Sequence, residues 1–141
     1  KRMIREYRYE EIEAGMEERF QVEITAEKME LFRQITGDIN PLHCDREFAQ
    51  SKGYRDCVVY GMLTSSFYST LAGVYLPGRN CLLHSVETKL LKPVFVGDFL
   101  TVVGRVEEKE ELFHQLKIKA EIWNQKGEKV SRAIIKAGVI Q

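Results

Sequence analysis

Cysteine, proline and tryptophan are all scarce in this sequence, with three, three and one residues among 141. Cys44, Cys57 and Cys81 are odd in number and lack the spacing of metal-ligand pairs. This count argues against a zinc site and favours thiols that stay reduced, so we expect a cytoplasmic protein. The sequence also lacks a glycine-rich phosphate loop and a serine triad, and we expect neither a bound metal nor a resident cofactor.

Neither sign of charge is in excess. The 21 Lys and Arg residues equal the 21 Asp and Glu residues, which argues against a nucleic-acid partner, because such proteins usually carry a basic excess. No apolar run approaches the length that spans a bilayer, so we expect no membrane partner. With 44% apolar residues and 141 positions, the chain suits one globular domain over residues 1–141.

The N-terminal part of the chain predicts a lead-in, a strand and a helix. Residues 1–16 carry charge with little periodicity, and we expect them to be irregular. Apolar and polar residues alternate over 19–24, which predicts a half-buried strand. Thr25 then stands where a helix N-cap belongs, and Gly37 stands where that helix would end.

Two further helices are predicted in the middle of the chain. Asp45 can cap a short helix over 46–52. The segment 58–76 is the longest without charge, which predicts a buried helix. The start of this helix stays open, because it could begin near Gly61 or be capped five residues earlier by Asp56.

Strands dominate the second half of the chain. Four segments have the composition and length of strands, namely 81–92, 99–108, 112–124 and 128–140. The predicted turns between them fall at 97–98, in the charged run 107–111 and at 125–127. A long buried helix followed by successive antiparallel strands predicts a sheet wrapped around that helix, which is an α+β arrangement.

The stretch Gly37-Asp38-Ile39-Asn40-Pro41-Leu42-His43 carries the strongest functional signal. Pro41 fixes its own backbone and keeps Asn40 out of the helical region, so the chain must turn. Such a turn can fold Asp38 and His43 toward a common point, where a general base and a general acid could share one small reacting group. A simpler interpretation stays open, in which Asp38 and Asn40 only make the hydrogen bonds of a local turn.

With its flanks, this stretch resembles the signature of the MaoC-like, R-specific enoyl-CoA hydratases (hydratase 2 type). The signature places an aromatic, an aliphatic and a small residue before Gly-Asp-x-Asn-Pro, followed by an aliphatic residue, His, five spacers and a small residue. Here the outer positions are Phe32, Ile35, Thr36 and Ala49. The similarity is strongest over 32–97, and residues 91–98 also look like the family. It implies the hot-dog fold, a single domain whose antiparallel sheet wraps around a long central helix.

The resemblance implies a hydro-lyase that reversibly adds water, with syn geometry, to a trans-2-enoyl thioester. Asp38 would be the main base, His43 its acid/base partner, and Asn40 would fix the loop. Negative charge develops on the thioester oxygen and needs a donor. The family places that donor at a glycine matching Gly61, and an amide at a helix start lacks a partner inside the helix. Tyr60 stands where the family often has histidine, which leaves the shape and polarity of the pocket open.

Weaker candidates surround these residues. Met62 and Ser65 belong to the first turns of the buried helix and could contact the substrate, although Ser65, like Ser66, also suits close packing. Cys44 beside His43 suggests a nucleophile pair, but sequential neighbours in an extended chain point to opposite faces, which disfavours it.

Some charged and aromatic candidates have weaker support still. Lys52, Arg55 and Arg79 could meet the phosphates of coenzyme A, since a phosphate tail needs positive charge. His84 and His114 lie in strand-like segments without partners at metal or catalytic spacing, so we expect structural or surface roles for both.

The implied substrate is an acyl-CoA or an acyl-carrier-protein thioester, in which coenzyme A or the carrier protein is only part of the substrate. A single chain would leave one sheet edge open, so the resemblance also implies a homodimer or an assembly of dimers. Two other functions stay open, namely a hot-dog acyl-CoA thioesterase and a non-catalytic subunit that binds acyl thioesters.

Overall fold

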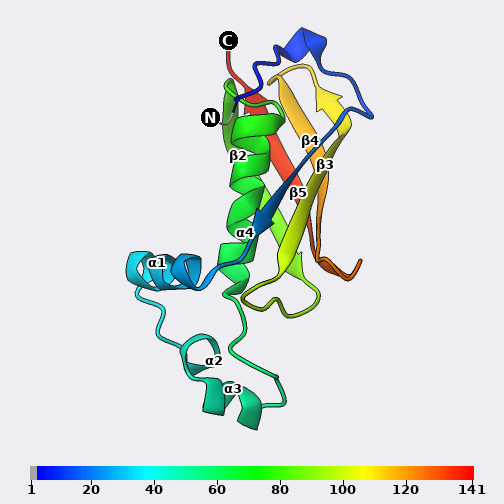
Figure 1. Ribbon diagram of the computed structural model, residues 1–141. Coiled ribbons are helices and arrows are strands. Elements are labelled where there is room, and N and C mark those ends of the chain that lie inside the picture. The colour runs from blue at the N-terminus through cyan, green and yellow to red at the C-terminus, as the bar shows by residue number, and fades with distance from the viewer. Residues whose placement is uncertain (1–2) are drawn as a thin grey trace.

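A five-stranded antiparallel sheet curves around one central helix, α4 (Gly61–Thr70), in the computed structural model, which describes residues 3–141 (Figure 1). The strand order is β1-β3-β4-β5-β2, so β1 and β2 form the two edges of the sheet. This is the hot-dog arrangement. It confirms the predicted α+β class, in which the sheet wraps around a long helix.

All five predicted strands are present, and their ends lie within a few residues of the predicted ones. Their bounds are β1 (Glu17–Glu23), β2 (Cys81–Leu90), β3 (Phe99–Glu110), β4 (Gln115–Trp123) and β5 (Lys129–Val139). On β4 the even-numbered residues from Leu116 to Ile122 are buried, while their odd-numbered neighbours are half-buried or exposed. One face of this strand therefore packs on the core and the other meets solvent, as the alternation predicted.

The predicted turn at 107–111 is wrong. Strand β3 continues to Glu110, and the turn covers residues 111–114, with Leu112 exposed and His114 in the left-handed region at φ 48°. The charged run 107–110 continues the strand because a lysine on the neighbouring strand pairs with its carboxylates. Lys117 on β4 lies 3.6 Å from a carboxylate oxygen of Glu107 and 3.4 Å from one of Glu108.

Helix α4 supplies the inner layer of the molecule. It begins at Gly61, and it continues into a wider π-helical turn, η2 (Leu71–Tyr75). Asp56 is not its cap, because the Asp56 carboxylate accepts the neighbouring Cys57 N–H at 2.7 Å. Leu71 packs against Gly104 of β3. A Cβ at position 104 would lie only 2.6 Å from the Leu71 side chain, so the glycine lets the helical layer approach the sheet closely.

Hydroxyl groups cross the core between α4 and the sheet. Ser65 Oγ lies 3.2 Å from Thr88 Oγ1, which lies 3.3 Å from Ser131 Oγ, and Ser131 lies 2.8 Å from the Tyr68 hydroxyl. Each member has a partner, so these buried polar groups keep hydrogen bonds that they would otherwise lose on leaving water.

The described part of the lead-in, residues 3–16, contains one 3-10 turn, η1 (Tyr9–Glu11). Tyr9 and Ile12 are buried and join the main core, and residue 6 bridges to Gly78. Residues 1 and 2 of the predicted lead-in lie outside the described residues.

Three short helices project from one end of the sheet and α4 (Figure 1). We call residues 26–51, comprising α1 (Ala26–Thr36), α2 (Pro41–Cys44) and α3 (Arg46–Ser51), the helical overhang, and we call the sheet with α4 the body. Thr25 caps α1 by accepting the Lys28 N–H, and Asp45 caps α3 by accepting the Phe48 N–H, each at 3.2 Å. These caps confirm the predicted helix starts, whereas α2 was not predicted.

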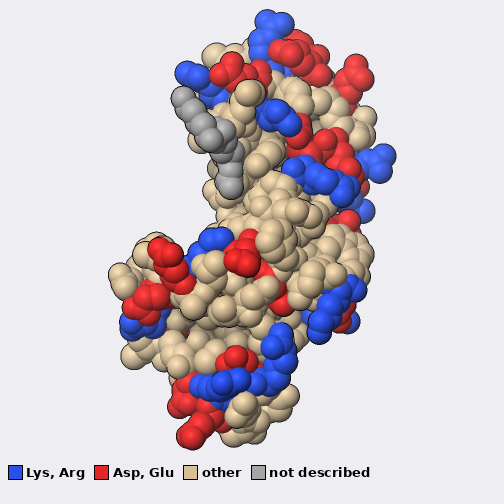
Figure 2. Space-filling model, in the orientation of Figure 1, with Lys and Arg blue, Asp and Glu red and all other residues tan. Residues whose placement is uncertain are grey.

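The charged side chains are not evenly spread over the face that carries α4. Figure 2 shows Lys, Arg, Asp and Glu above, below and along the right-hand edge of this face, while its central part is mostly uncharged. The exposed positions of the helix, Met62, Ser66, Ser69 and Gly73, recur at helical spacing and carry no charge.

Candidate active site

The loop between α1 and α2 is built by the local hydrogen bonds that its sequence predicts. Asp38 Oδ1 accepts the Asn40 N–H at 3.1 Å, and Asn40 Oδ1 accepts the Leu42 N–H at 2.9 Å. Asn40 thereby caps α2, with Pro41 at its first position. Asp38 and Asn40 therefore do make the hydrogen bonds of a local turn, as the simpler interpretation predicted. The same loop also leads into α2, the short helix that carries His43 toward the body.

His43 is anchored to the segment that precedes α4. Its Nδ1 lies 2.6 Å from the carbonyl oxygen of Val58, and the Val58 N–H returns a hydrogen bond of 3.1 Å to Leu42. A carbonyl can only accept, so Nδ1 carries the proton in this contact. In the neutral ring, Nε2 is then the nitrogen with the free lone pair, available for chemistry.

Tyr60 contacts both Asp38 and His43. Its hydroxyl donates to the Asp38 carbonyl oxygen at 2.7 Å, and its ring centroid lies 4.3 Å from that of His43. Phe32 of α1 packs on the same ring at 4.8 Å. Tyr60 thus contacts the backbone of Asp38 and the ring of His43, a role that the sequence motif did not reveal. The Asp38 carboxylate itself is exposed and lines neither of the two hollows that His43 lines, so its approach to His43 stays a prediction.

A cleft beside the first turn of α4 contains His43 and Gly61. We call it the α4 cleft; its volume is about 430 Å³. The other lining residues are Tyr54, Val58, Val59, Thr64, Leu90, Leu91, Lys92, Pro93, Val94 and Val130. Most of these side chains are apolar, which suits an acyl chain better than a sugar or nucleotide. His43 also lines a smaller hollow on its other side, together with Cys44, Tyr60 and residues of α1.

Gly61 offers a free backbone donor at the cleft. Leu63 and Thr64 donate the first bonds of the helix, to Tyr60 O at 3.0 and 3.1 Å, so the N–H groups of Gly61 and Met62 precede the helical ladder. They lie at the positive end of the α4 dipole. A Cβ on Gly61 would overlap Leu90 Cδ1, so a side chain at this position would require Leu90 to move.

The remaining predicted site residues lie at varying distances from this arrangement. Met62 is exposed, while Ser65 is buried in the hydroxyl chain, and Ser66 donates to the Leu63 carbonyl at 2.6 Å. Thr64, rather than Ser65, lines the α4 cleft. A direct contact of Met62 or Ser65 with a substrate stays a prediction.

The basic candidates and the other histidines all have partners of their own. Lys52 lies over the Phe48 ring and Arg55 over the Phe95 ring, and Arg79 pairs with Glu6 at 3.1 Å. His84 Nδ1 lies 2.8 Å from Gln115 Nε2, and the His114 ring stacks on Tyr9 at 4.3 Å. The two histidines therefore have structural contacts, whereas coenzyme A contacts of the basic residues stay predictions.

Cys44 does not pair with His43, but the reason differs from the predicted one. The two residues lie on the helical turn α2 rather than in extended chain, and Cys44 Sγ is 3.4 Å from the Tyr60 hydroxyl. Within residues 3–141, no group of three His, Cys, Asp or Glu side chains could hold a metal ion. No helix in that range is both long and apolar enough to span a membrane.

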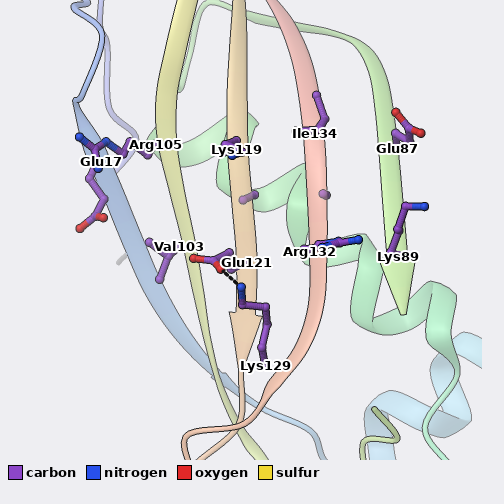
Figure 3. A pocket seen from close by; sticks show the side chains of 12 residues that line it. Glu17, Glu87, Lys89, Val103, Arg105, Lys119, Glu121, Lys129, Arg132 and Ile134 are labelled. Atoms are coloured by element: carbon purple, nitrogen blue, oxygen red, sulfur yellow. Dashed lines mark ion pairs between the residues drawn. The ribbon is translucent and has the colours of Figure 1, made fainter. Parts of the chain in front are cut away.

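A larger hollow, of about 540 Å³, lies on the outward face of the sheet (Figure 3). Its lining is charged, with Lys89, Arg105, Lys119, Lys129 and Arg132 beside Glu17, Glu87 and Glu121. Lys129 pairs with Glu121 at 2.5 Å. Asp38, His43 and Gly61 are not among the lining residues, so this groove is separate from the candidate site.

Comparison with known proteins agrees with this geometry. Residues 9–126 match the family model of the MaoC like domain. An (R)-specific enoyl-CoA hydratase of Aeromonas caviae is 34% identical over 90 residues, which are 64% of this chain and 67% of that protein. An enzyme of the same name from Rhodospirillum rubrum is 30% identical over 106 residues, which are 72% of this chain and 74% of that protein.

A solved structure extends the likeness to nearly the whole fold. The unliganded R-hydratase PhaJ1 from Pseudomonas aeruginosa superposes with a TM-score of 0.90 at 25% identity, covering 98% of this chain and 88% of that one. The family model covers the loop, every strand except β5, and all the residues that line the α4 cleft except Val130. This chain belongs to the MaoC-like dehydratase family.

Proposed function

We propose that this protein is an R-specific enoyl-CoA hydratase, which equally dehydrates R-3-hydroxyacyl thioesters. One observation carries the proposal: Tyr60 contacts both the backbone of Asp38 and the ring of His43, and His43 lines a cleft where α4 begins with a bare glycine amide. The named hydratases among the relatives support the same reaction.

The chemistry follows from the two side chains acting on one water molecule. The Asp38 carboxylate takes a proton from the water as its oxygen attacks the β-carbon of the enoyl thioester. His43 acts as the imidazolium, which keeps its Nδ1 proton on Val58 O and gives its Nε2 proton to the α-carbon on the same face. Both elements of water are then on the substrate, and the proton on Asp38 returns to His43 to restore the pair. With such coupled groups, Asp38 is the main base and His43 its partner.

The thioester oxygen becomes negative when the β-carbon is attacked, and the proposal assigns its stabilisation to the Gly61 N–H. A preorganised backbone donor at a helix start costs no rearrangement in the transition state. Asn40 contributes indirectly, because its side chain caps α2 and so fixes the turn that carries His43.

Substrate and location form part of the same proposal. Coenzyme A or an acyl-carrier protein enters only as part of the thioester, and the mechanism uses no resident cofactor or metal. The three cysteines are free thiols, which supports a reducing, cytoplasmic setting.

A turnover assay with crotonyl-CoA and longer enoyl-CoAs tests the function. We expect the conjugated enoyl absorbance to disappear without release of free thiol, and the product to be the R-3-hydroxyacyl-CoA. Release of thiol in step with substrate loss would identify a thioesterase instead. Tight binding of crotonyl-CoA without any product would identify a non-catalytic binding subunit.

We also propose that the protein forms a homodimer along the edge strand β2. Within the described residues, β2 pairs only with β5, and it exposes Leu82, Leu83 and Leu90. The neighbouring face of α4 is uncharged (Figure 2). An open edge beside apolar side chains is a template for pairing with a second strand, and a second copy would cover both.

Substitution on this edge tests the dimer. The double variant Leu82→Glu/Leu83→Glu places charge on the edge and should yield a monomer in light scattering after size exclusion. Leu112→Glu is the matched control, because Leu112 is also an exposed leucine but lies in the β3–β4 turn. A double variant that stays dimeric would show that the interface lies elsewhere.

A further inference from the structure

The Tyr60 hydroxyl takes part in two hydrogen bonds whose directions can be derived. The Asp38 carbonyl oxygen, at 2.7 Å, can only accept, so the single hydroxyl proton points to it. Cys44 Sγ lies 3.4 Å from the same hydroxyl and must then be the donor. The three residues therefore form one directed chain, from the Cys44 thiol through Tyr60 to the backbone of Asp38.

The Tyr60 ring constrains the imidazole in a second way. The two rings are inclined by 33°, and Phe32 supports the Tyr60 ring at 4.8 Å. Tyr60 itself is only 2% exposed, so its ring has little room to move. Since Nδ1 of His43 is also bound to Val58 O, both the tilt and the rotation of the imidazole are fixed.

The hydroxyl stays a donor over the whole working range of pH. Burial, followed by the hydrogen bond with the Cys44 thiol, raises the pKa of the Tyr60 hydroxyl above its ordinary value. The phenol is therefore protonated wherever the acid/base pair operates, and it cannot itself take the proton from water at neutral pH.

We propose that Tyr60 is a positioning residue of this active site, whose hydroxyl fixes the Asp38 loop while its ring fixes the His43 imidazole. The proposal rests on the proposed acid/base roles of Asp38 and His43. It assigns no chemical step to Tyr60. A single buried side chain thus sets the relative placement of two groups that must reach the same water, and small displacements of such groups are costly in rate.

The first test removes only the hydroxyl. In Tyr60→Phe we expect kcat to fall roughly tenfold, equivalent to about 1.4 kcal/mol, while KM changes by less than about twofold. Tyr68→Phe is the matched control, because it removes a buried hydroxyl bond of 2.8 Å to Ser131 from α4, the helix that Tyr60 immediately precedes, away from both proposed catalytic residues. It should lower the melting temperature and leave kcat unchanged.

The second test removes the ring. In Tyr60→Leu, kcat should fall roughly a hundredfold, because both constraints are lost. The His43 Nδ1 proton, observed by NMR in ¹⁵N-labelled protein, should remain slow to exchange in Tyr60→Phe. It should exchange rapidly in Tyr60→Leu, where the imidazole no longer rests on an aromatic ring. If Tyr60 had a purely structural role, both variants would have a lower melting temperature, but kcat would not fall selectively while KM stayed nearly constant.

The outcomes separate this inference from the proposed function. If Asp38→Asn and His43→Gln abolish turnover while both Tyr60 variants keep wild-type kcat, the positioning role is overturned and the acid/base pair stands. If Asp38→Asn and His43→Gln keep turnover, the acid/base assignment fails, and the positioning role fails with it. A kcat loss in Tyr68→Phe equal to that in Tyr60→Phe would also overturn the inference, since any lost core hydroxyl would then have the same effect.

Discussion

The body and the helical overhang are held together in different ways. In the body, long strands and α4 bury a continuous apolar core. The overhang buries far less, since α1 and α2 contain no buried residue and α3 buries only Ala49. It is joined to the body by single contacts, including the ring contact of Phe32 on Tyr60 and the hydrogen bond of His43 to Val58.

The two halves of the site come from these two regions. The overhang contributes the proposed acid/base pair, whereas the body contributes the Gly61 amide and most of the apolar cleft. Directional hydrogen bonds set geometry sharply but add little net stability, while burial adds stability without setting a bond angle. Substitutions in the overhang should therefore change rate, and substitutions in the body should change stability.

The largest expected effect is loss of the acid/base pair. His43→Gln and Asp38→Asn should each lower kcat by about a thousandfold, or ~4 kcal/mol, because a positioned acid or base contributes roughly 10²–10⁴ in rate. Both residues lie outside the core, so the melting temperature should stay within a few degrees of wild type. Steady-state kinetics with thermal melting checks both points, and near-normal turnover in either variant would break the assignment.

A core substitution should show the opposite pattern. Ile118→Ala on β4 removes a fully buried side chain and should cost about 3 kcal/mol of unfolding free energy, measured by chemical denaturation. The kcat of the folded fraction should not change. If Ile118→Ala lowered kcat as strongly as His43→Gln, the expectation that body substitutions affect stability and overhang substitutions affect rate would be wrong.

Substitution of Gly61 tests a residue of the body that contributes to the site, where we expect an effect on rate rather than on stability. Gly61→Ala places a methyl group against Leu90 and should lower kcat/KM by about thirtyfold, or ~2 kcal/mol, by obstructing the approach to the amide. Leu90 is 54% exposed and can turn aside, so stability should change little. Adding Leu90→Ala should restore part of the activity. An additive loss in the double variant would mean that the clash with Leu90 is not the cause.

The smallest effect is expected at the cap of α2. Asn40→Ala removes the bond to the Leu42 N–H, which should destabilise this turn locally by ~1 kcal/mol and lower kcat several-fold. Hydrogen exchange over 38–44 should accelerate while the strands stay protected. Asp45→Ala is the control, because it removes the equivalent cap of α3. It should accelerate exchange in α3 and leave kcat unchanged.

Local signals in the sequence were sufficient for much of the fold. The caps at Thr25 and Asp45 and the glycine at the end of α1 act on their own neighbours, so the sequence predicted them correctly. The start of α4 could not be decided in the same way. Asp56 and Gly61 both suit a helix start, and the choice depends on Asp56 bonding to Cys57 instead.

The contacts that assemble the site depend on residues far apart in the sequence. Tyr60 meets Asp38 across 22 positions and Cys44 across 16, and no spacing rule connects them. Helix α2 is four residues long, too short to show a periodic pattern. The sequence motif singled out Asp38 and His43, but their shared contact with Tyr60 could be found only in the structure.

Strand β2 links two places that are otherwise separate. Its final residue, Leu90, lines the α4 cleft against Gly61, and its outer side is an open edge of the sheet. Any association along that edge which moves Leu90 also changes the space available to a thioester. By thermodynamic reciprocity, a bound thioester would then change the association constant by the same factor by which association changes the affinity for the thioester, so substrate affinity would depend on protein concentration.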